Sequence, residues 1–332
     1  MTRDDRPEED RPTESVGTQE QDTAGHRQTA GSDGSTVNGP RPVKRRRRTN
    51  AELEVIDDAL VAAVAEEHPV TVRGAYYRLV SIGVVDKTEA GYDLVQRELL
   101  KLRRSGRVPY WWVTDGTRWV RQPRTYTSLD DMLTEAASTY RRDIWSTSVD
   151  AVWMFSEKDA ISGVIWPITE AWDVPLGVLR GYTSESFAHR IAEQIRHAAE
   201  VRMHIGGTVN LYQLGDHDPS GVDLWRDFGK RMSGFIGDPE IVAHVNFERI
   251  AVTPEQIEDL GLMTRPTKKS DTRSRGFKGE SVEVDAIPAA TMRQIVEDAI
   301  TRHVDQDRLR ILKVAEESER TLLYRMAGEV AS

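Results

Sequence analysis

The chain has 332 residues, no cysteine and a formal net charge of −9. Without cysteine it can form neither disulfides nor thiolate metal sites, so any metal must be held by oxygen or imidazole ligands. It has no run of roughly 18 apolar residues and no secretory start, so we expect a cytoplasmic, nucleoid-associated protein with no membrane partner. The length leaves room for two folded units and a tail.

Residues 1–49 are predicted to form a disordered tail with a basic end. They are rich in Asp, Glu, Thr, Gln, Gly and Pro and nearly free of apolar side chains, so burial cannot offset the entropy of ordering them. The basic run Lys44–Arg48 closes the tail. Two interpretations stay open for this run: an arm that binds phosphates, or a solvated charge run beside a linker.

Residues 50–125 have the pattern of a winged helix. Apolar side chains at helical spacing predict three helices, the first with Asn50 as its N-cap, and strand-like residues around a turn at Asp115-Gly116 then predict a hairpin. The predicted elements are helices 50–67, 71–82 and 88–104, and hairpin strands 108–113 and 118–120. Three helices followed by a hairpin favour a winged-helix (CAP-like) domain.

Basic side chains gather on the third helix and the hairpin, the two elements with which a winged helix usually contacts DNA. They include Arg97, Lys101, Arg103, Arg104, Arg107 and Arg118. A second basic segment contains Lys268 and Lys269. We therefore predict double-stranded DNA as the partner. The alternative is that these cations only solvate an exposed helix and a loop.

After a connector over residues 126–148, which contains a predicted helix at 129–140, strands alternate with helices over 149–330. Buried strands are predicted at 151–155, 174–179 and 209–214, with helices after each. This alternation is typical of an α/β fold with a mainly parallel sheet.

Acidic residues follow two of these strands. Glu157 stands at the end of the first strand, and Asp216 and Asp218 follow the third. Ligands of parallel sheets bind at the carboxyl ends of the strands, and Mg²⁺ prefers oxygen ligands, so we expect a magnesium site on these three carboxylates. Each also has a structural explanation, because Glu157 would favour a helix N-terminus and Asp218-Pro219 is a common helix start.

Several segments resemble one known family. Phe155–Ala160 and Leu214–Gly221 look like the Glu motif and the Asp-x-Asp-Pro-x-Gly motif of Toprim domains. The Pro and Gly are most similar to the branch that contains the topoisomerase VI A subunit and the meiotic double-strand-break transesterases. Arg180-Gly181-Tyr182, Ile250–Gln256 and Val284–Pro288 resemble further segments of that branch, so the resemblance runs from about residue 70 to 299. It implies a Toprim domain after the winged helix.

The resemblance also implies a nucleophile, because Val72–Tyr77 is similar to the family's tyrosine motif with Tyr77 at the catalytic position. Helix geometry agrees, since Tyr76 falls on the apolar stripe whereas Tyr77 lies off it and shares a face with Arg73. Tyr76 is then expected in the core and Tyr77 to be available. Arg73 with the metal could stabilise the charge that develops at phosphate. The alternative is a tyrosine that only packs at a domain boundary.

Three functions follow as hypotheses. The first is a topoisomerase VI A-like transesterase, a homodimer in which Tyr77 attacks DNA near Mg²⁺ and leaves a 5′-phosphotyrosine. The second is a Toprim nuclease that uses water, and the third is a non-catalytic winged-helix DNA-binding protein. The segment Arg103–Tyr110 departs from the family, and no ATPase is present in this chain, so strand passage would need a separate ATPase subunit.

Overall fold

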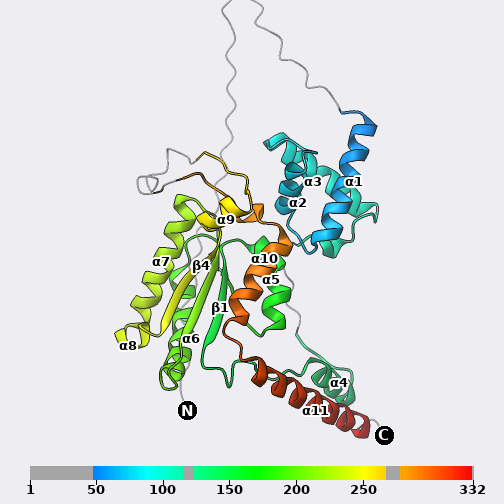
Figure 1. The fold of residues 1–332 in the computed structure, drawn as a ribbon. Helices are drawn as coiled ribbons and strands as arrows, with labels where there is room; N and C mark the ends of the chain where they lie inside the picture. The colour runs from blue at the N-terminus through cyan, green and yellow to red at the C-terminus, as the bar shows by residue number, and fades with distance from the viewer. Residues whose placement is uncertain (1–47, 115–122, 267–276, 278, 331–332) are drawn as a thin grey trace, which may run out of the picture. The chain divides into compact units, whose positions relative to one another are not determined.

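The computed structural model describes residues 48–114, 123–266, 277 and 279–330. The predicted tail lies outside these residues except for its last two positions, and from Arg48 onwards the chain forms one compact unit. Within the described part of that unit, the α/β class is confirmed (Figure 1). The winged-helix and Toprim assignments, and the boundaries at 125 and 148, stay predictions.

The three helices predicted at the start of this unit are present, and a threonine caps each of them. They are α1 (Asn50–Glu67), α2 (Val72–Ser81) and α3 (Glu89–Arg104). The first cap is Thr49 and not Asn50, because the Thr49 hydroxyl accepts from the Glu52 N–H while the Glu52 carboxylate accepts from the Thr49 N–H. This reciprocal capping box satisfies two backbone donors that an Asn50 cap would leave open.

The first strand of the predicted hairpin is wrong. Residues 110–112 form a 3₁₀ helix, η1 (Tyr110–Trp112), after Pro109, and Val113 makes a parallel bridge to Val70. The β-branched and aromatic residues had suggested a strand, but the bridge of Val113 is to Val70, in the short connection between α1 and α2. The second predicted strand, at 118–120, lies outside the described residues.

The described strands form one parallel sheet in the order β2-β1-β3-β4. They are β1 (Ala151–Ser156), β2 (Leu176–Val178), β3 (Val209–Leu214) and β4 (Val245–Ala251). β1 and β3 match their prediction to within a residue, whereas β2 is shorter than predicted and β4 was not predicted. The register pairs Ser156 of β1 with Leu214 of β3, so these two strands end together.

Helices cover both faces of the sheet, which explains why its central strands are apolar on both sides (Figure 1). On one face α5 (Asp159–Ala171) and α10 (Ala289–Thr301) pack over Met154, and this core continues into α1, α2 and α3. On the other face α6 (Glu185–Met203) and α7 (Pro219–Ile236) pack over Phe155.

The remaining helices complete the unit. They are α4 (Leu129–Thr139), α8 (Pro239–Val242), α9 (Pro254–Asp259), the 3₁₀ turn η3 (Val284–Ala286) and α11 (Gln306–Val330). α11 runs beside α4 (Figure 1), where the Tyr140 hydroxyl donates to Glu319 over 2.7 Å. No helix in the described part of the chain is long and apolar enough to cross a membrane.

Candidate functional site

The carboxyl ends of β1 and β3 bring Glu157 and Asp216 together. The Glu157 N–H donates to the Leu214 carbonyl over 2.9 Å, and the Asp216 N–H donates to Oε2 of Glu157, also over 2.9 Å. Two carboxylates that are 59 positions apart in the chain thus share one sheet edge, where ligands of parallel sheets bind. The two central strands, whose register aligns their ends, create this approach.

Two glycines, Gly215 directly after β3 and Gly221 in the first turn of α7, make room for the Glu157 carboxylate. A Cβ atom at Gly215 would lie 2.6 Å from Oε2 of Glu157, and one at Gly221 would lie 3.1 Å from it. A side chain at either position would press on the carboxylate or on the loop. The close contacts therefore explain why both positions are occupied by glycine.

Asp218 is the N-cap of α7, as its structural explanation predicted. Its Oδ1 accepts from the Gly221 N–H over 2.8 Å, and Pro219 occupies the first turn of the helix. Its Oδ2 lies 3.7 Å from the Arg265 guanidinium. The cap places Asp218 at the same edge as Glu157, but one of its oxygens is engaged by the backbone.

A lysine and a second acidic pair belong to this cluster and were not predicted as site residues. The Lys158 ammonium lies 2.7 Å from Asp216 and 3.0 Å from Asp285, and Asp216 also accepts from the Val284 N–H. Glu283 pairs with Arg73 and Arg265, each over 2.7 Å. Lys158 lies within the Glu motif and Asp285 within a family-like segment, so their positions beside known motif residues were the available signal.

Burial and mutual repulsion shift the acids of the cluster. Burial, then the Asp216 charge, raises the pKa of Glu157, and burial raises the pKa of Asp216 although Lys158 opposes it. For Glu283, burial acts upwards but Lys158 and Arg73 outweigh it and lower the pKa. Glu157 is thus a carboxylate whose charge is poorly compensated, which is the condition that favours an added cation.

An arginine lies behind the two strand ends. The Arg249 guanidinium donates to the carbonyls of Gly215 and Asp216, and burial lowers its pKa. Its Nε and Nη1 are buried with no hydrogen-bond partner among the described residues. From β4, Arg249 therefore holds the backbone of the loop that carries Asp216.

A cleft of about 630 Å³ opens onto the cluster. Its lining combines acids and cations from α2, α3, the β1 end and η3, including Arg73, Arg103, Lys158, Asp216, Glu283 and Asp285. A cleft that contains both carboxylates and guanidinium groups suits a phosphate held through a divalent cation and direct ion pairs.

Tyr77 is not available in this structure, contrary to the prediction. It is 7% exposed and lines a separate cavity of about 180 Å³, together with Arg78 and Leu262, whereas Tyr76 is core as predicted. The helix pattern did not separate the two tyrosines, because both belong to one core cluster and η3 and the segment after α9 cover Tyr77. Burial, then the Glu283 charge, raises the pKa of Tyr77 to about 12.

Two carboxylates at the shared sheet edge could offer oxygen ligands to a magnesium ion. Glu157 and Asp216 provide oxygen ligands at one edge, and Mg²⁺ commonly uses one or two carboxylates together with waters and substrate phosphate. In the described part of the chain, no group of three or more His, Asp or Glu side chains is arranged to hold a metal by itself. Such a site would depend on substrate oxygens to complete its shell.

The predicted DNA-contacting residues differ in their surroundings. Arg97 pairs with Glu98, Lys101 with Asp57 and Arg107 with Asp58, each over 3.0 Å or less. Arg104 is exposed, and Arg103 lines the cleft. Of these pairs, only the Arg107–Asp58 pair is exposed on both sides, and such a pair is weak enough to exchange for a phosphate contact. The acidic partners of Arg97 and Lys101 are buried. Arg118, Lys268 and Lys269 lie outside the described residues.

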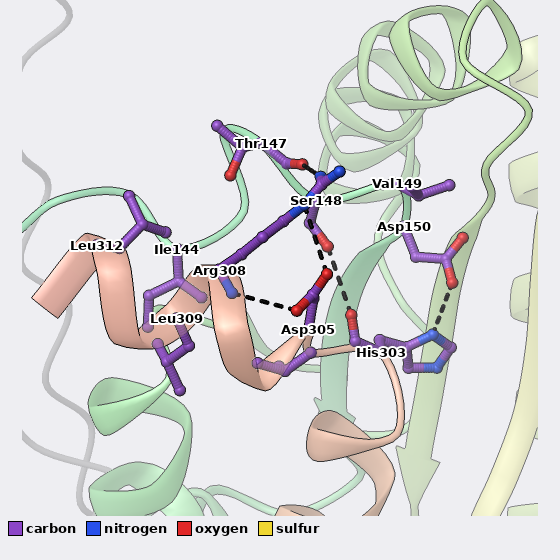
Figure 2. Close-up of a pocket in the computed structure, with 11 residues that line it drawn as sticks. Ile144, Thr147, Ser148, Val149, Asp150, His303, Asp305, Arg308, Leu309 and Leu312 are labelled. Atoms are coloured by element: carbon purple, nitrogen blue, oxygen red, sulfur yellow. Dashed lines mark hydrogen bonds and ion pairs between the residues drawn. The ribbon is translucent and has the colours of Figure 1, made fainter.

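A smaller cavity of about 150 Å³ lies at the amino end of β1 and contains none of the predicted site residues (Figure 2). There His303 bonds to Asp150 over 2.9 Å through Nδ1 and to the Tyr212 hydroxyl over 2.7 Å through Nε2. Both ring nitrogens are thus engaged, and Arg308 is tied to the Thr147 carbonyl. This arrangement clamps the start of α11 to the sheet.

Comparisons with known proteins add no assignment, because no family model, curated protein or solved structure matches the chain. The geometry of the cleft and the motif resemblance are therefore the basis for a functional proposal.

Proposed function

We propose that this protein is a magnesium-dependent enzyme that cleaves a strand of double-stranded DNA at the Glu157–Asp216 cluster. The observation that carries the proposal is the meeting of Glu157, Asp216 and Lys158 at the aligned ends of β1 and β3. Asp216 and Lys158 also line the adjoining cleft, together with Arg73 and Arg103. A parallel α/β sheet alone supports many activities, so the site and not the fold supports this proposal.

Glu157 and Asp216 would hold the ion, with Asp218 close to it at the start of α7. When bound, Mg²⁺ supplies positive charge beside the phosphate oxygens. Arg73 and Lys158 face the same cleft and would bind the remaining phosphate oxygens and orient the phosphorus atom. Arg249 keeps the loop of Asp216 in place from behind.

Tyr77 is the first candidate for the nucleophile, on the strength of the motif resemblance. In this reaction a bond forms between the tyrosine oxygen and phosphorus, the bond to the 3′ oxygen breaks, and the phenolic proton ends on that 3′ oxygen. Within one chain, Tyr77 and Asp216 line different cavities. The proposal therefore includes a homodimer in which Tyr77 of one subunit approaches the acids of the other.

Water is the second candidate, and a specific observation favours it. A tyrosine that is 7% exposed with a pKa of about 12 is a poor nucleophile until α2 moves or a cation approaches. A nuclease would use the same two carboxylates and the same cleft without requiring that change.

A covalent-adduct assay separates the two reactions. Internally labelled supercoiled DNA is incubated with the protein and Mg²⁺, denatured, and resolved with and without protease treatment. Transesterification predicts label that is freed only by protease and that disappears in Tyr77→Phe. Hydrolysis predicts free label without protease and unchanged cutting by Tyr77→Phe. DNA binding that is indifferent to Mg²⁺, with no cleavage, would support the non-catalytic hypothesis.

A further inference from the structure

Two neighbouring aromatic residues of η1 are unusually exposed. Tyr110 is 58% exposed and Trp111 is 67% exposed, more than any other large aromatic residue in the described part of the chain. Leaving so much aromatic surface in water gives up the free energy of its burial, so such a pair commonly marks a contact surface. Tyr110 and Trp111 are called the aromatic platform below.

The aromatic platform is held rigidly although its side chains are exposed. The Val70 N–H donates to the Trp112 carbonyl and the Thr114 N–H donates to the Val70 carbonyl, both over 3.0 Å. Trp111 makes perpendicular ring contacts with His68 at 4.9 Å and with Trp112 at 6.0 Å. A surface that is ordered before binding loses little conformational entropy when a ligand stacks on it.

The platform adjoins the cleft of the acid cluster. The Arg103 guanidinium lies 4.6 Å from the centre of the Tyr110 ring, and Arg103 also lines the cleft that contains Asp216. Thr114, four residues after Tyr110, lines the same cleft and packs so closely on α5 that a Cβ atom at Gly163 would overlap it. One arginine therefore touches both the aromatic platform and the cleft.

We propose that the aromatic platform stacks an unpaired base of a DNA strand whose phosphate lies in the cleft. An aromatic side chain beside guanidinium groups is the combination that binds single strands, since any base can stack on the ring while the cations hold the backbone. A paired base in a regular duplex is already stacked on its neighbours. The preferred substrate is thus a duplex with an unpaired segment, which deepens the proposed function and rests on it.

The test measures binding in EDTA, so that it does not depend on cleavage. Fluorescence anisotropy compares a blunt duplex with the same duplex carrying a single-stranded tail, for the wild type and for Trp111→Ala, Trp111→Phe and Trp166→Ala. Trp166, on α5 and 48% exposed, serves as the control for loss of an exposed indole. Because Trp111 is exposed, Trp111→Ala is expected to fold, which its melting temperature checks.

We expect the wild type to bind the tailed duplex more tightly than the blunt one. Trp111→Ala should lose about 5- to 100-fold in affinity for the tailed duplex only, the range that one base stack contributes. Trp111→Phe should keep most of the preference, and Trp166→Ala should keep all of it. A 2-aminopurine base in the tail should be quenched on binding by the wild type and less so by Trp111→Ala.

Three results would overturn the proposal that the aromatic platform stacks a base. One is equal affinity of the wild type for both duplexes, and another is an equal loss of affinity for both in Trp111→Ala. The third is unchanged DNA binding by Trp111→Ala together with loss of binding to anionic lipid vesicles. A tail preference that needs Trp111, in a protein that never cleaves DNA, would keep the platform and refute the proposed enzyme. The two proposals therefore fail independently.

Discussion

The Lys158 ammonium lies 2.7 Å from Oδ1 of Asp216 and 3.0 Å from Oδ2 of Asp285, so the acid cluster already contains a cation from its own chain. The site is thereby partly neutralised before any substrate arrives. A divalent ion at Asp216 would compete with this lysine for the same carboxylate.

Lys158→Met should leave two buried carboxylates uncompensated and lower the free energy of unfolding by about 3 kcal/mol. Added Mg²⁺ should then stabilise the variant more than the wild type, because no ammonium competes for Asp216. Thermal unfolding with and without Mg²⁺ measures both effects. Lys230→Met, at an exposed position of α7, should change stability by no more than about 0.5 kcal/mol. An identical Mg²⁺ response of the wild type and Lys158→Met would refute the competition.

Glu157→Gln should separate stability from activity. Because burial and Asp216 raise the pKa of Glu157 in the fold, the folded protein favours the protonated acid, and the free energy of unfolding falls as pH rises through that pKa. Glutamine still accepts from the Asp216 N–H but carries no charge. In metal-free buffer at pH 7 we expect a melting temperature at or above that of the wild type, with DNA cleavage reduced by about 100-fold or more. A clearly lower melting temperature would contradict the assigned repulsion.

Thr71 is predicted to matter more than an ordinary helix cap. Its hydroxyl accepts from the Gly74 N–H and donates to Asp285 over 2.8 Å, whereas Thr88 caps α3 through the Gly91 N–H. Thr88→Val should lower the free energy of unfolding by about 1 kcal/mol and Thr71→Val by about 2–3 kcal/mol. The larger loss is expected because Thr71→Val also removes a hydrogen-bond donor from the buried Asp285 carboxylate. Denaturant unfolding of the two variants measures the difference, and equal costs would show that the bond to Asp285 adds nothing.

Tyr77 should ionise late. Because its pKa is about 12, its absorbance should change at a higher pH than that of ordinary tyrosines, whose pKa is about 10. The difference between alkaline titrations of the wild type and Tyr77→Phe isolates this residue. Since the folded-state pKa exceeds the unfolded value, the wild type should also lose stability between these two pH values while Tyr77→Phe loses less. A difference curve centred near the ordinary value would mean that Tyr77 is accessible.

Local patterns predicted much of the fold. The helix starts at Thr71 and Thr88 and the extent of β3 follow from capping and from runs of buried residues, which depend on near neighbours. The aromatic run at 108–113 was wrongly predicted as a hairpin strand because the partner of Val113 is Val70, more than forty positions earlier in the chain. β4 alternates polar and apolar residues near the sheet edge and offered a weaker signal.

The candidate site was predicted only in part. Strand ends identified Glu157 and Asp216, because parallel strands bring their carboxyl ends to one edge. Lys158 and Asp285 could not be assigned to it from spacing, since their contacts join segments 127 positions apart. The burial of Tyr77 likewise depends on η3 and the segment after α9, which no pattern within α2 reveals.

Plasmid cutting by Asp216→Asn tests most directly whether Glu157 and Asp216 support magnesium-dependent cleavage of DNA. Supercoiled plasmid is incubated with the wild type, with Asp216→Asn and with Asp227→Asn, whose residue lies on α7 and pairs with Arg231. We predict nicking or linearisation by the wild type and by Asp227→Asn in Mg²⁺ and none in EDTA. The melting curve of Asp216→Asn should show that it is folded, and its rate of plasmid cleavage should fall by about 100-fold or more. Undiminished cutting by Asp216→Asn, or no cutting by the wild type at any Mg²⁺ concentration, would contradict the account.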